Sequence, residues 1–216
     1  MSVLAREVAL PGSAEAVAQV IEAGRAASAR GWVPATSGNF SVRIDAEHIA
    51  VTRSGVDKGA LTPKDVLIQN ITEPLVPRSS AEAGLHTRLY ADNPGIGAIF
   101  HAHAPAASVL GRRHEAAGRV LIEGWELQKA LKGVTSHETV VEVPVFANDQ
   151  DIAALADRVA TRLAVPAEAA RFAAPGYLLA GHGLYAWGAG ADDAFRHLEA
   201  LEVLFNQLIL FRSYQP

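Results

Sequence analysis

Two histidines one residue apart, His101 and His103, close the apolar stretch GAIFHAHAPA at residues 97–106. In an extended strand, side chains at positions i and i+2 point to the same face of the sheet, so both imidazoles can reach one metal ion. A catalytic zinc site needs a third protein ligand and keeps one position open for water or substrate. The pair by itself is also compatible with two ordinary histidines at a sheet edge. A metal site is therefore indicated only if the chain offers a third ligand.

His182 is the best candidate for that third ligand. It stands between two glycines in the otherwise apolar stretch LLAGHGLYAWG, and glycine in a strand permits close approach of a backbone or a ligand. His114 and His197 lie in patterns typical of exposed surface, and His137 begins HETVV, which lacks the second histidine of an H-E-x-x-H zinc helix. A hydrogen-bonded core histidine is the alternative interpretation of His182.

Two carboxylates are candidates for acid–base chemistry. Glu126 stands beside the large apolar Trp125, and such a neighbour disfavours the charged form, which suits proton transfer near neutral pH. A solvated helix residue paired with a nearby lysine such as Lys129 is the alternative. Glu82 follows Ser79 by three positions, a spacing that matches a helix capping box and would satisfy the carboxylate without any catalytic role.

Three loops have the composition of phosphate-binding turns. The stretches TSGNFS, TRSGVDKG and RSSAE are rich in Ser, Thr, Gly and Lys and lie where a strand or a turn gives way to the next element. Such loops offer backbone N–H groups and hydroxyls to phosphate, above all at the start of a helix. Each loop alone is weak support, because ordinary turns use the same residues.

Helical and strand patterns alternate along the chain and must position these side chains. Apolar periodicity and capping residues predict helices over residues 13–31, 79–94, 124–133, 149–163 and 192–211. Alternating or continuous apolar runs predict strands over residues 40–44, 48–54, 96–103, 139–146 and 177–187, the first two forming a hairpin. The mixture of hairpins and crossovers indicates an α/β sandwich with helices on both faces of a mixed sheet.

Composition bounds the class of protein. The chain has 216 residues, half of them hydrophobic, and we expect one domain over residues 1–216. The net charge of −4 and the pI near 6.1 favour neither nucleic acid nor an anionic membrane as a partner. Without cysteine, a metal must be held by histidine and carboxylate. Arg6 and Glu7 interrupt the apolar N-terminus, so we expect a soluble, cytoplasmic protein without a signal peptide or a membrane span.

Taken together, the motifs resemble the class II aldolase/adducin-head family across nearly the whole chain. They are TSGNFSVR, SGVDKG, SSAE followed by LH, HAH and GHGLYAWG, in that order. The stretch LIEGWELQKALKGVTSHETVVEVPVFANDQD, with GHGLYAWG and RHLEALEVLF, is similar to a dehydratase branch of the family. The resemblance implies a three-layer α/β/α sandwich with a central mixed, mostly antiparallel sheet. It also implies a homotetramer with active sites at subunit interfaces.

The resemblance further assigns roles to individual residues. It implies one zinc ion per subunit held by His101, His103 and His182, and proton transfer by Glu126. Trp125 is a candidate wall for an apolar substrate tail. The positions at which relatives hold the substrate phosphate correspond here to Gly38, Asn39, Ser54, Gly55 and Ser80.

One departure from the family pattern lies in the third loop. Relatives commonly have proline before the SAE element, whereas Ser79 stands there in this chain. This difference concerns the geometry of the loop, not the residues expected to carry the chemistry.

The expected function is removal of water from a small phosphorylated ketose. A sugar-phosphate aldolase or epimerase that uses Glu82 as its base is the alternative enzyme. A non-catalytic, adducin-like interaction module is a third interpretation, but it requires lost ligands, and the sequence retains them all. Three imidazoles also suit Fe(II), Mn(II), Co(II) or Ni(II), so the sequence leaves the identity of the metal open.

Overall fold

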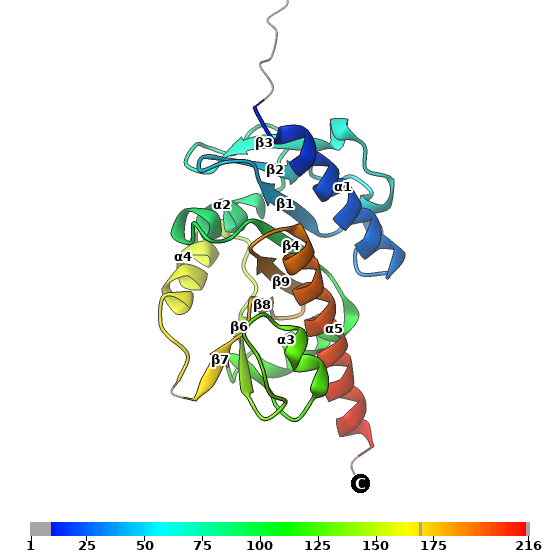
Figure 1. The fold of residues 1–216 in the computed structure, drawn as a ribbon, viewed down its shortest axis with the longest axis vertical. Coiled ribbons are helices and arrows are strands. Elements are labelled where there is room, and N and C mark those ends of the chain that lie inside the picture. The colour runs from blue at the N-terminus through cyan, green and yellow to red at the C-terminus, as the bar shows by residue number, and fades with distance from the viewer. Residues whose placement is uncertain (1–9, 169, 215–216) are drawn as a thin grey trace, which may run out of the picture.

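A mixed β-sheet runs through the centre of the protein (Figure 1). The structure is a computed structural model that describes residues 10–168 and 170–214. Arg6 and Glu7, on which the expectation about the N-terminus rests, lie outside these residues. Within the described residues the sheet has nine strands in the order β3-β2-β1-β4-β9-β8-β6-β5, with β7 paired to β6. The strands are β1 (Asn39–Arg43), β2 (His48–Thr52), β3 (Val66–Asn70), β4 (Ala98–Ala102), β5 (Arg119–Ile122), β6 (Val140–Phe146), β7 (Arg171–Ala173), β8 (Gly176–Leu179) and β9 (Gly183–Gly188).

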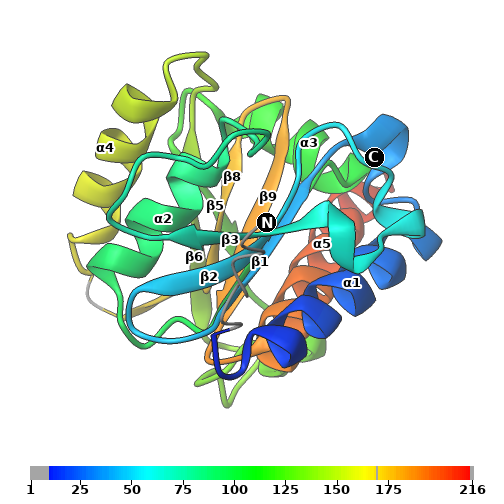
Figure 2. The same ribbon diagram turned by 90° about the horizontal axis from the view of Figure 1, so that it is seen from above.

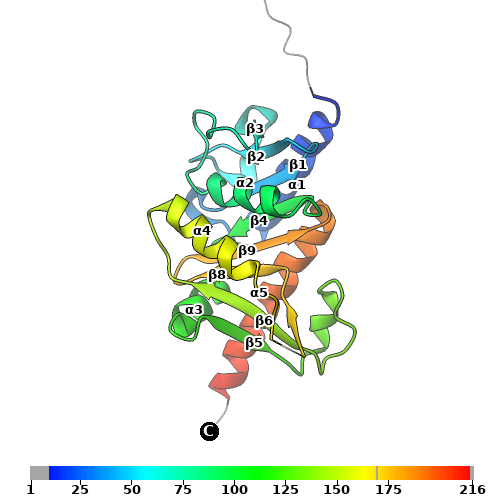
Figure 3. The same ribbon diagram turned by 90° about the vertical axis from the view of Figure 1, so that its left-hand side faces the viewer.

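Helices cover both faces of this sheet, as Figures 2 and 3 show. Helices α1, α3 and α5 pack on one face, and α2 and α4 lie together on the other. The helices are α1 (Ser13–Ala29), α2 (Ala83–Asp92), α3 (Pro105–His114), α4 (Ile152–Leu163) and α5 (Ala191–Ser213), with short 3-10 turns η1 (Pro34–Thr36), η2 (Lys58–Ala60), η3 (Pro63–Asp65) and η4 (Glu126–Ala130). The expected three-layer sandwich is confirmed.

The sheet is mostly antiparallel, also as expected. Strand β6 pairs in parallel with β7 and with β8, and the remaining strand pairs are antiparallel among the described residues. A parallel pair needs a crossover connection, which α4 supplies between β6 and β8. The predicted hairpin is the β1–β2 pair.

Alternation along β4 decides which way the first histidine points. Phe100 belongs to the core beneath α1, α3 and α5, whereas Ile99 belongs to the core beneath α2 and α4. Because strand side chains repeat every two residues, His101 shares the face of Ile99. The side chain of His101 is therefore directed to the α2 and α4 side, where α2 begins.

Several predicted boundaries differ from the observed ones. The strand expected over residues 177–187 is two antiparallel strands, β8 and β9, joined by a tight turn. The helix expected over 79–94 begins only at Ala83, and the one over 124–133 is the 3-10 turn η4. Strands β3, β5 and β7 were not expected, because short segments become strands through their partners and not through local periodicity.

Among the described residues, no helix combines the length and the apolar character that crossing a membrane requires.

Candidate active site

His101 is fixed at the end of β4 by its neighbours in the sheet. Its register partners are Asn39 on β1 and Tyr185 on β9, and the side chain is fully buried. The imidazole stacks on the ring of Tyr185, with centroids 4.0 Å apart and an interplanar angle of 15°. Nδ1 lies 3.1 Å from the carbonyl oxygen of Leu184, an acceptor, so this nitrogen donates and Nε2 is left with its lone pair.

His103 lies one residue beyond the strand, just before α3. Its ring is tilted against that of His101, with centroids 4.9 Å apart. The i and i+2 relation has therefore brought both imidazoles to one place, as the sequence predicts.

His182 lies in the turn between β8 and β9, and not within a strand as expected. The two glycines beside it are required for different reasons, one for its backbone conformation and one for the lack of a side chain. Gly181 adopts a φ of +67°, which favours glycine, and a Cβ at Gly183 would lie 2.2 Å from the carbonyl oxygen of Ala102. Gly183 thus permits the β9 backbone to lie close to β4. The hydroxyl of Ser108 on α3 donates to the carbonyl oxygen of His182 at 2.8 Å, which ties this turn to α3.

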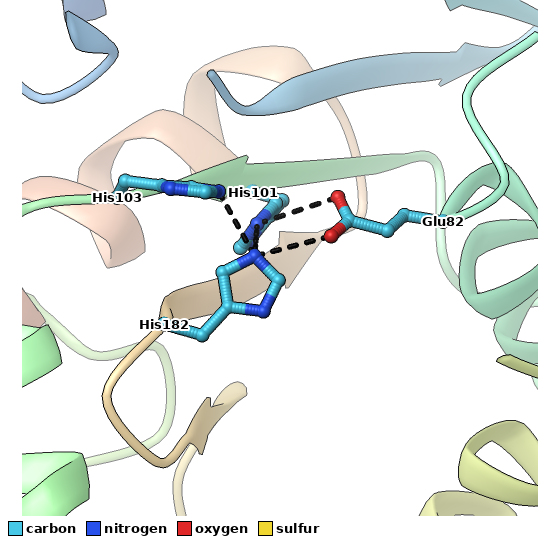
Figure 4. Close-up of side chains that lie close together, drawn as sticks. All are labelled: Glu82, His101, His103 and His182. Carbon is cyan, nitrogen blue, oxygen red and sulfur yellow. Dashed lines mark hydrogen bonds and ion pairs between the residues drawn. The ribbon is translucent and has the colours of Figure 1, made fainter. Parts of the chain in front are cut away.

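The three imidazoles and the carboxylate of Glu82 converge on one point (Figure 4). One ligand atom from each of the four residues lies within 4.8 Å of all the others. Nε2 of His182 is 3.3 Å from Nε2 of His101 and 2.9 Å from Nε2 of His103. The oxygens of Glu82 lie 3.1 Å from Nε2 of His182 and 3.6 Å from Nε2 of His101.

This donor set fits a divalent metal ion. Four ligands around a zinc ion at bond lengths of about 2.0–2.2 Å are separated by roughly 3.3 Å, close to the distances observed here. Nδ1 of His182 lies 3.2 Å from Oδ1 of Asn148, just as Nδ1 of His101 faces a carbonyl oxygen. Such contacts at the second ring nitrogen orient a histidine for metal binding through Nε2.

The electrostatics favour neutral imidazoles facing an ionised carboxylate. Burial lowers the pKa of His101 well below its usual value and that of His103 to about 4. Burial alone would raise the pKa of Glu82, but the hydrogen bond to His182 and the adjacent imidazoles outweigh it and lower the pKa to about 2. Neutral histidine and ionised carboxylate are the protonation states that bind metals.

Of the two roles that the sequence leaves open for Glu82, the structure does not show the capping box. Glu82 occupies the N-cap position of α2, and its side chain forms no capping hydrogen bond. The hydroxyl of Ser79 is buried and finds no partner among the described residues. The carboxylate of Glu82 instead turns toward the histidines and accepts a hydrogen bond of 2.7 Å from the side-chain amide of Asn39.

The phosphate-loop residues gather around the same cluster. A cavity of about 360 Å³ is lined by His103, His182 and Glu82 and by residues of the three loops, among them Gly38, Ser54, Gly55 and Ser80. Asn39 reaches the cluster through Glu82. Loops that are well separated in the sequence thus meet beside the candidate metal ligands.

Glu126 and Trp125 lie outside this site. Neither residue lines the cavity or belongs to the cluster of candidate metal ligands in the part of the chain that the structure describes. The side chain of Glu126 is 72% exposed and accepts a hydrogen bond of 2.5 Å from Lys129, and its segment packs on α5. The half-buried ring of Trp125 meets the edge of Phe211 with centroids 5.8 Å apart. Their assigned roles remain predictions.

Sequence reasoning did not single out several residues that line the cavity, two of which contact or approach the cluster, and it misjudged one histidine. Asn148, which follows β6, and Lys58, in the SGVDKG motif, both line the cavity. The lysine of that motif was a usable signal, but Asn148 had none. His197 is buried, not exposed as expected, because its Nδ1 contacts the carbonyl oxygen of Trp187 at 2.7 Å and its Nε2 accepts from a backbone N–H.

Comparison with known proteins identifies one family and relatives that match most of the chain in sequence. Residues 18–209 match the family described as class II aldolase and adducin N-terminal domain. The methylthioribulose-1-phosphate dehydratase of Bradyrhizobium sp. (strain BTAi1 / ATCC BAA-1182) is 64% identical over 212 residues, which are 97% of this chain and 98% of the relative. The enzyme of the same name from Parvibaculum lavamentivorans is 50% identical over 193 residues, 89% of this chain and 92% of the relative.

Solved structures share the fold. L-fuculose-1-phosphate aldolase from Thermus thermophilus superposes with a TM-score of 0.75 at 30% identity, over 94% of this chain and 97% of that one. A sugar-phosphate aldolase from Thermotoga maritima superposes with a TM-score of 0.65 at 15% identity, over 94% of this chain and 97% of that one. The second likeness concerns the fold alone.

Proposed function

Since the chain belongs to the family of class II aldolase and adducin N-terminal domains, we propose that it removes water from 5-methylthioribulose 1-phosphate. The product is 2,3-diketo-5-methylthiopentyl 1-phosphate, an intermediate of methionine salvage. The observation that carries this proposal is the meeting of three histidines, Glu82 and the phosphate-type loops in one cavity. Relatives that cover nearly the whole chain carry the name of this dehydratase.

The reaction needs two proton movements. The C3 carbon of the substrate loses a proton, and the C4 hydroxyl leaves as water after it has gained one. The resulting enol becomes a 2,3-diketone when a proton returns to carbon. A carboxylate that first accepts the C3 proton can deliver it to the leaving oxygen, so a single acid–base residue can serve both steps.

The cluster residues would hold the metal, which we assign as one zinc ion per chain. His101 and His103, whose pKa values are lowered by burial, present neutral nitrogens, His182 places its Nε2 beside them, and Glu82 supplies an ionised oxygen. When bound, zinc supplies Lewis-acid polarisation of a substrate carbonyl. The imidazoles keep this position rigid, because the second nitrogen of both His101 and His182 contacts a protein oxygen.

We assign the proton transfer to Glu126 and propose that it acts on the site of a neighbouring subunit. In its own chain this carboxylate is exposed and lies outside the cavity. Phe211, which contacts the neighbouring Trp125, and Leu210 beside it in the sequence are also exposed, which suits an interface with another copy. A homotetramer with sites between subunits, in which Trp125 forms an apolar wall for the methylthio group, accounts for these positions.

Mixing two inactive variants tests this arrangement. Glu126→Gln and His101→Ala tetramers should each lose activity, and subunit exchange between them should restore part of it. Mixed tetramers then contain sites that join an intact metal cluster to an intact Glu126. The matched control mixes His101→Ala with His103→Ala, which leaves every site defective. Absence of any gain in the first mixture after proven exchange would place Glu126 outside the neighbouring site.

Product identification tests the reaction itself. Incubation of the zinc-loaded protein with 5-methylthioribulose 1-phosphate in deuterated water should yield the diketone, with solvent deuterium on its carbon skeleton. L-fuculose 1-phosphate should be a poor substrate, since it lacks the methylthio group.

Aldol cleavage is the second candidate, and the position of Glu82 favours it. This carboxylate lies within 3.1 Å of a candidate metal ligand, where it could deprotonate a C4 hydroxyl and break the C3–C4 bond. The two reactions differ in their products. A three-carbon phosphate fragment, from C1–C3 of the substrate, as the main product, with no diketone, would overturn the dehydratase proposal.

A further inference from the structure

Lys58 is a buried lysine at the edge of the candidate active site. Only 1% of its surface is exposed, yet it lines the cavity that holds His103 and His182. Its backbone is fixed by helix α1: a Cβ at Gly24 would lie 3.2 Å from the carbonyl oxygen of Lys58 and 2.6 Å from the side chain of Leu61. The position of the lysine is thus built into the packing of α1 against η2.

The ammonium group of Lys58 connects two loops of the cavity. It donates to the carbonyl oxygen of Thr36 at 2.6 Å and to that of Val56 at 2.9 Å. An ammonium has three N–H donors, so a third is available. Among the described residues, no carboxylate oxygen lies within 4 Å of Nζ.

The buried positive charge of Lys58 destabilises the folded protein unless a negative charge binds beside it. Burial lowers the pKa of Lys58, and the negative charges of Asp57 and Glu82 offset only part of this effect. A buried ion without a close partner of opposite charge destabilises a folded protein. A lysine at this position is explained if an anionic ligand pairs with its ammonium group.

The other charged side chains of the cavity already have partners. Arg53 pairs with Asp65 at 3.1 Å, and Asp149 pairs with Arg158 at 2.8 Å. The carboxylate of Glu82 is engaged by Asn39 and by the histidines. Among the described residues that line the cavity, Lys58 is therefore the cation that has no carboxylate partner. An incoming anion can neutralise its charge.

We propose that Lys58 binds the phosphate group of the substrate and is a main determinant of selectivity for a phosphate monoester. The proposal rests on the proposed function, in which the substrate is a ketose 1-phosphate. The loops that Lys58 joins contain Gly38 and Gly55, so a phosphate beside Nζ also lies beside their backbone. The third N–H of the ammonium then donates to a phosphate oxygen.

Inorganic phosphate is the probe for a direct test. Calorimetry on the zinc-loaded protein should show that Lys58→Met and Lys58→Gln bind phosphate about 10- to 100-fold more weakly than the natural chain, the usual effect of a charge-assisted hydrogen bond. Lys58→Arg, which keeps the charge, should retain part of the affinity. The control Lys64→Met removes an exposed lysine outside the cavity and should bind phosphate normally. The glutamine variant can still donate to the loop carbonyls and guards against misfolding of the methionine variant.

Steady-state kinetics distinguish phosphate binding by Lys58 from a purely structural role, because a structural role would not raise KM selectively. In the glutamine variant, KM for the ketose phosphate should rise more than kcat falls, at unchanged zinc content. Equal phosphate affinity in the natural chain and in a folded, zinc-loaded glutamine variant would overturn the assignment. A natural chain that binds phosphate through Lys58 but forms no diketone would leave this assignment standing and overturn only the dehydratase.

Discussion

At the scale of residues, the candidate metal ligands are held by aromatic groups beneath them. The ring of His101 stacks on Tyr185, and Tyr185 stacks on Tyr177 with centroids 4.8 Å apart and nearly parallel planes. Both tyrosines are fully buried, and Tyr177 also meets the edge of Phe146. A metal site supported by such a rigid stack requires little reorganisation when the ion binds.

Removing any one of the three imidazoles should strip the metal. His101→Ala, His103→Ala and His182→Ala are each expected to contain little zinc after dialysis, because a site with fewer protein ligands holds the ion much more weakly. Elemental analysis per chain measures this content. His114→Ala is the control, because His114 contacts Arg212 and not the cluster. Full zinc occupancy in the His182→Ala protein would show that the three-histidine assignment is wrong.

At the scale of elements, α3 connects the two histidine-bearing segments. The helix begins two residues after His103, and its Ser108 donates to the carbonyl oxygen of His182. Its N-terminus is held by Glu202 of α5, whose oxygens each accept a backbone N–H, from Ala106 and Ala107, at 2.9 Å. The first turn of a helix offers unpaired N–H groups and a partial positive charge, so a buried carboxylate is stabilised there.

Substitution of Glu202 should loosen this connection. Glu202→Gln keeps the shape but removes the charge and one acceptor, so urea denaturation should show a loss of about 1–3 kcal/mol in the free energy of unfolding. Because α3 also positions His103 and the His182 turn, zinc affinity measured by competitive titration should fall. The matched control Glu199→Gln lies on the same helix in an exposed pair with Arg30 and should cost less than about 1 kcal/mol. Equal effects of the two substitutions would contradict the role given to Glu202.

At the scale of the whole molecule, histidines buried away from the cluster make stability depend on pH. His86 is fully buried, with Nδ1 2.7 Å from the hydroxyl of Ser41, and burial lowers its pKa to about 3. Burial also lowers the pKa of His197. His86 is therefore neutral in the folded protein near pH 5, whereas the unfolded chain protonates this histidine below about pH 6.5.

Stability should therefore fall as the pH is lowered. For His86 the contribution is fully present above the unfolded pKa of about 6.5 and is lost toward pH 3, at up to about 1.4 kcal/mol per pH unit. The free energy of unfolding of the metal-free protein, measured by urea denaturation between pH 7 and pH 5, should show this slope. His86→Gln should be less stable at pH 7 but should have a shallower slope, by nearly one proton. His48→Gln, which removes a partly exposed histidine on the surface, is the control. An unchanged slope in His86→Gln would contradict the assigned protonation states.

Local sequence patterns determined the residue types of the site and much of the layered fold. The H-x-H spacing places two imidazoles together because strand side chains repeat every two residues, and this relation needs no distant contact. Apolar periodicity likewise predicts the long helices, since each buries one face. The loops rich in glycine and serine were identified for the same reason, as their turn chemistry is local.

Only the tertiary structure decided which of these residues act together. Glu82 could be a helix cap or a site residue by its sequence, and the place of α2 beside the end of β4 selected the site. His182 joins His101 across 81 positions because β9 pairs with β4. The burial of Lys58 likewise depends on packing with α1, and that of His197 on the segment that follows η4. Contacts between distant segments depend on how all the elements pack at once, and no local pattern records that result.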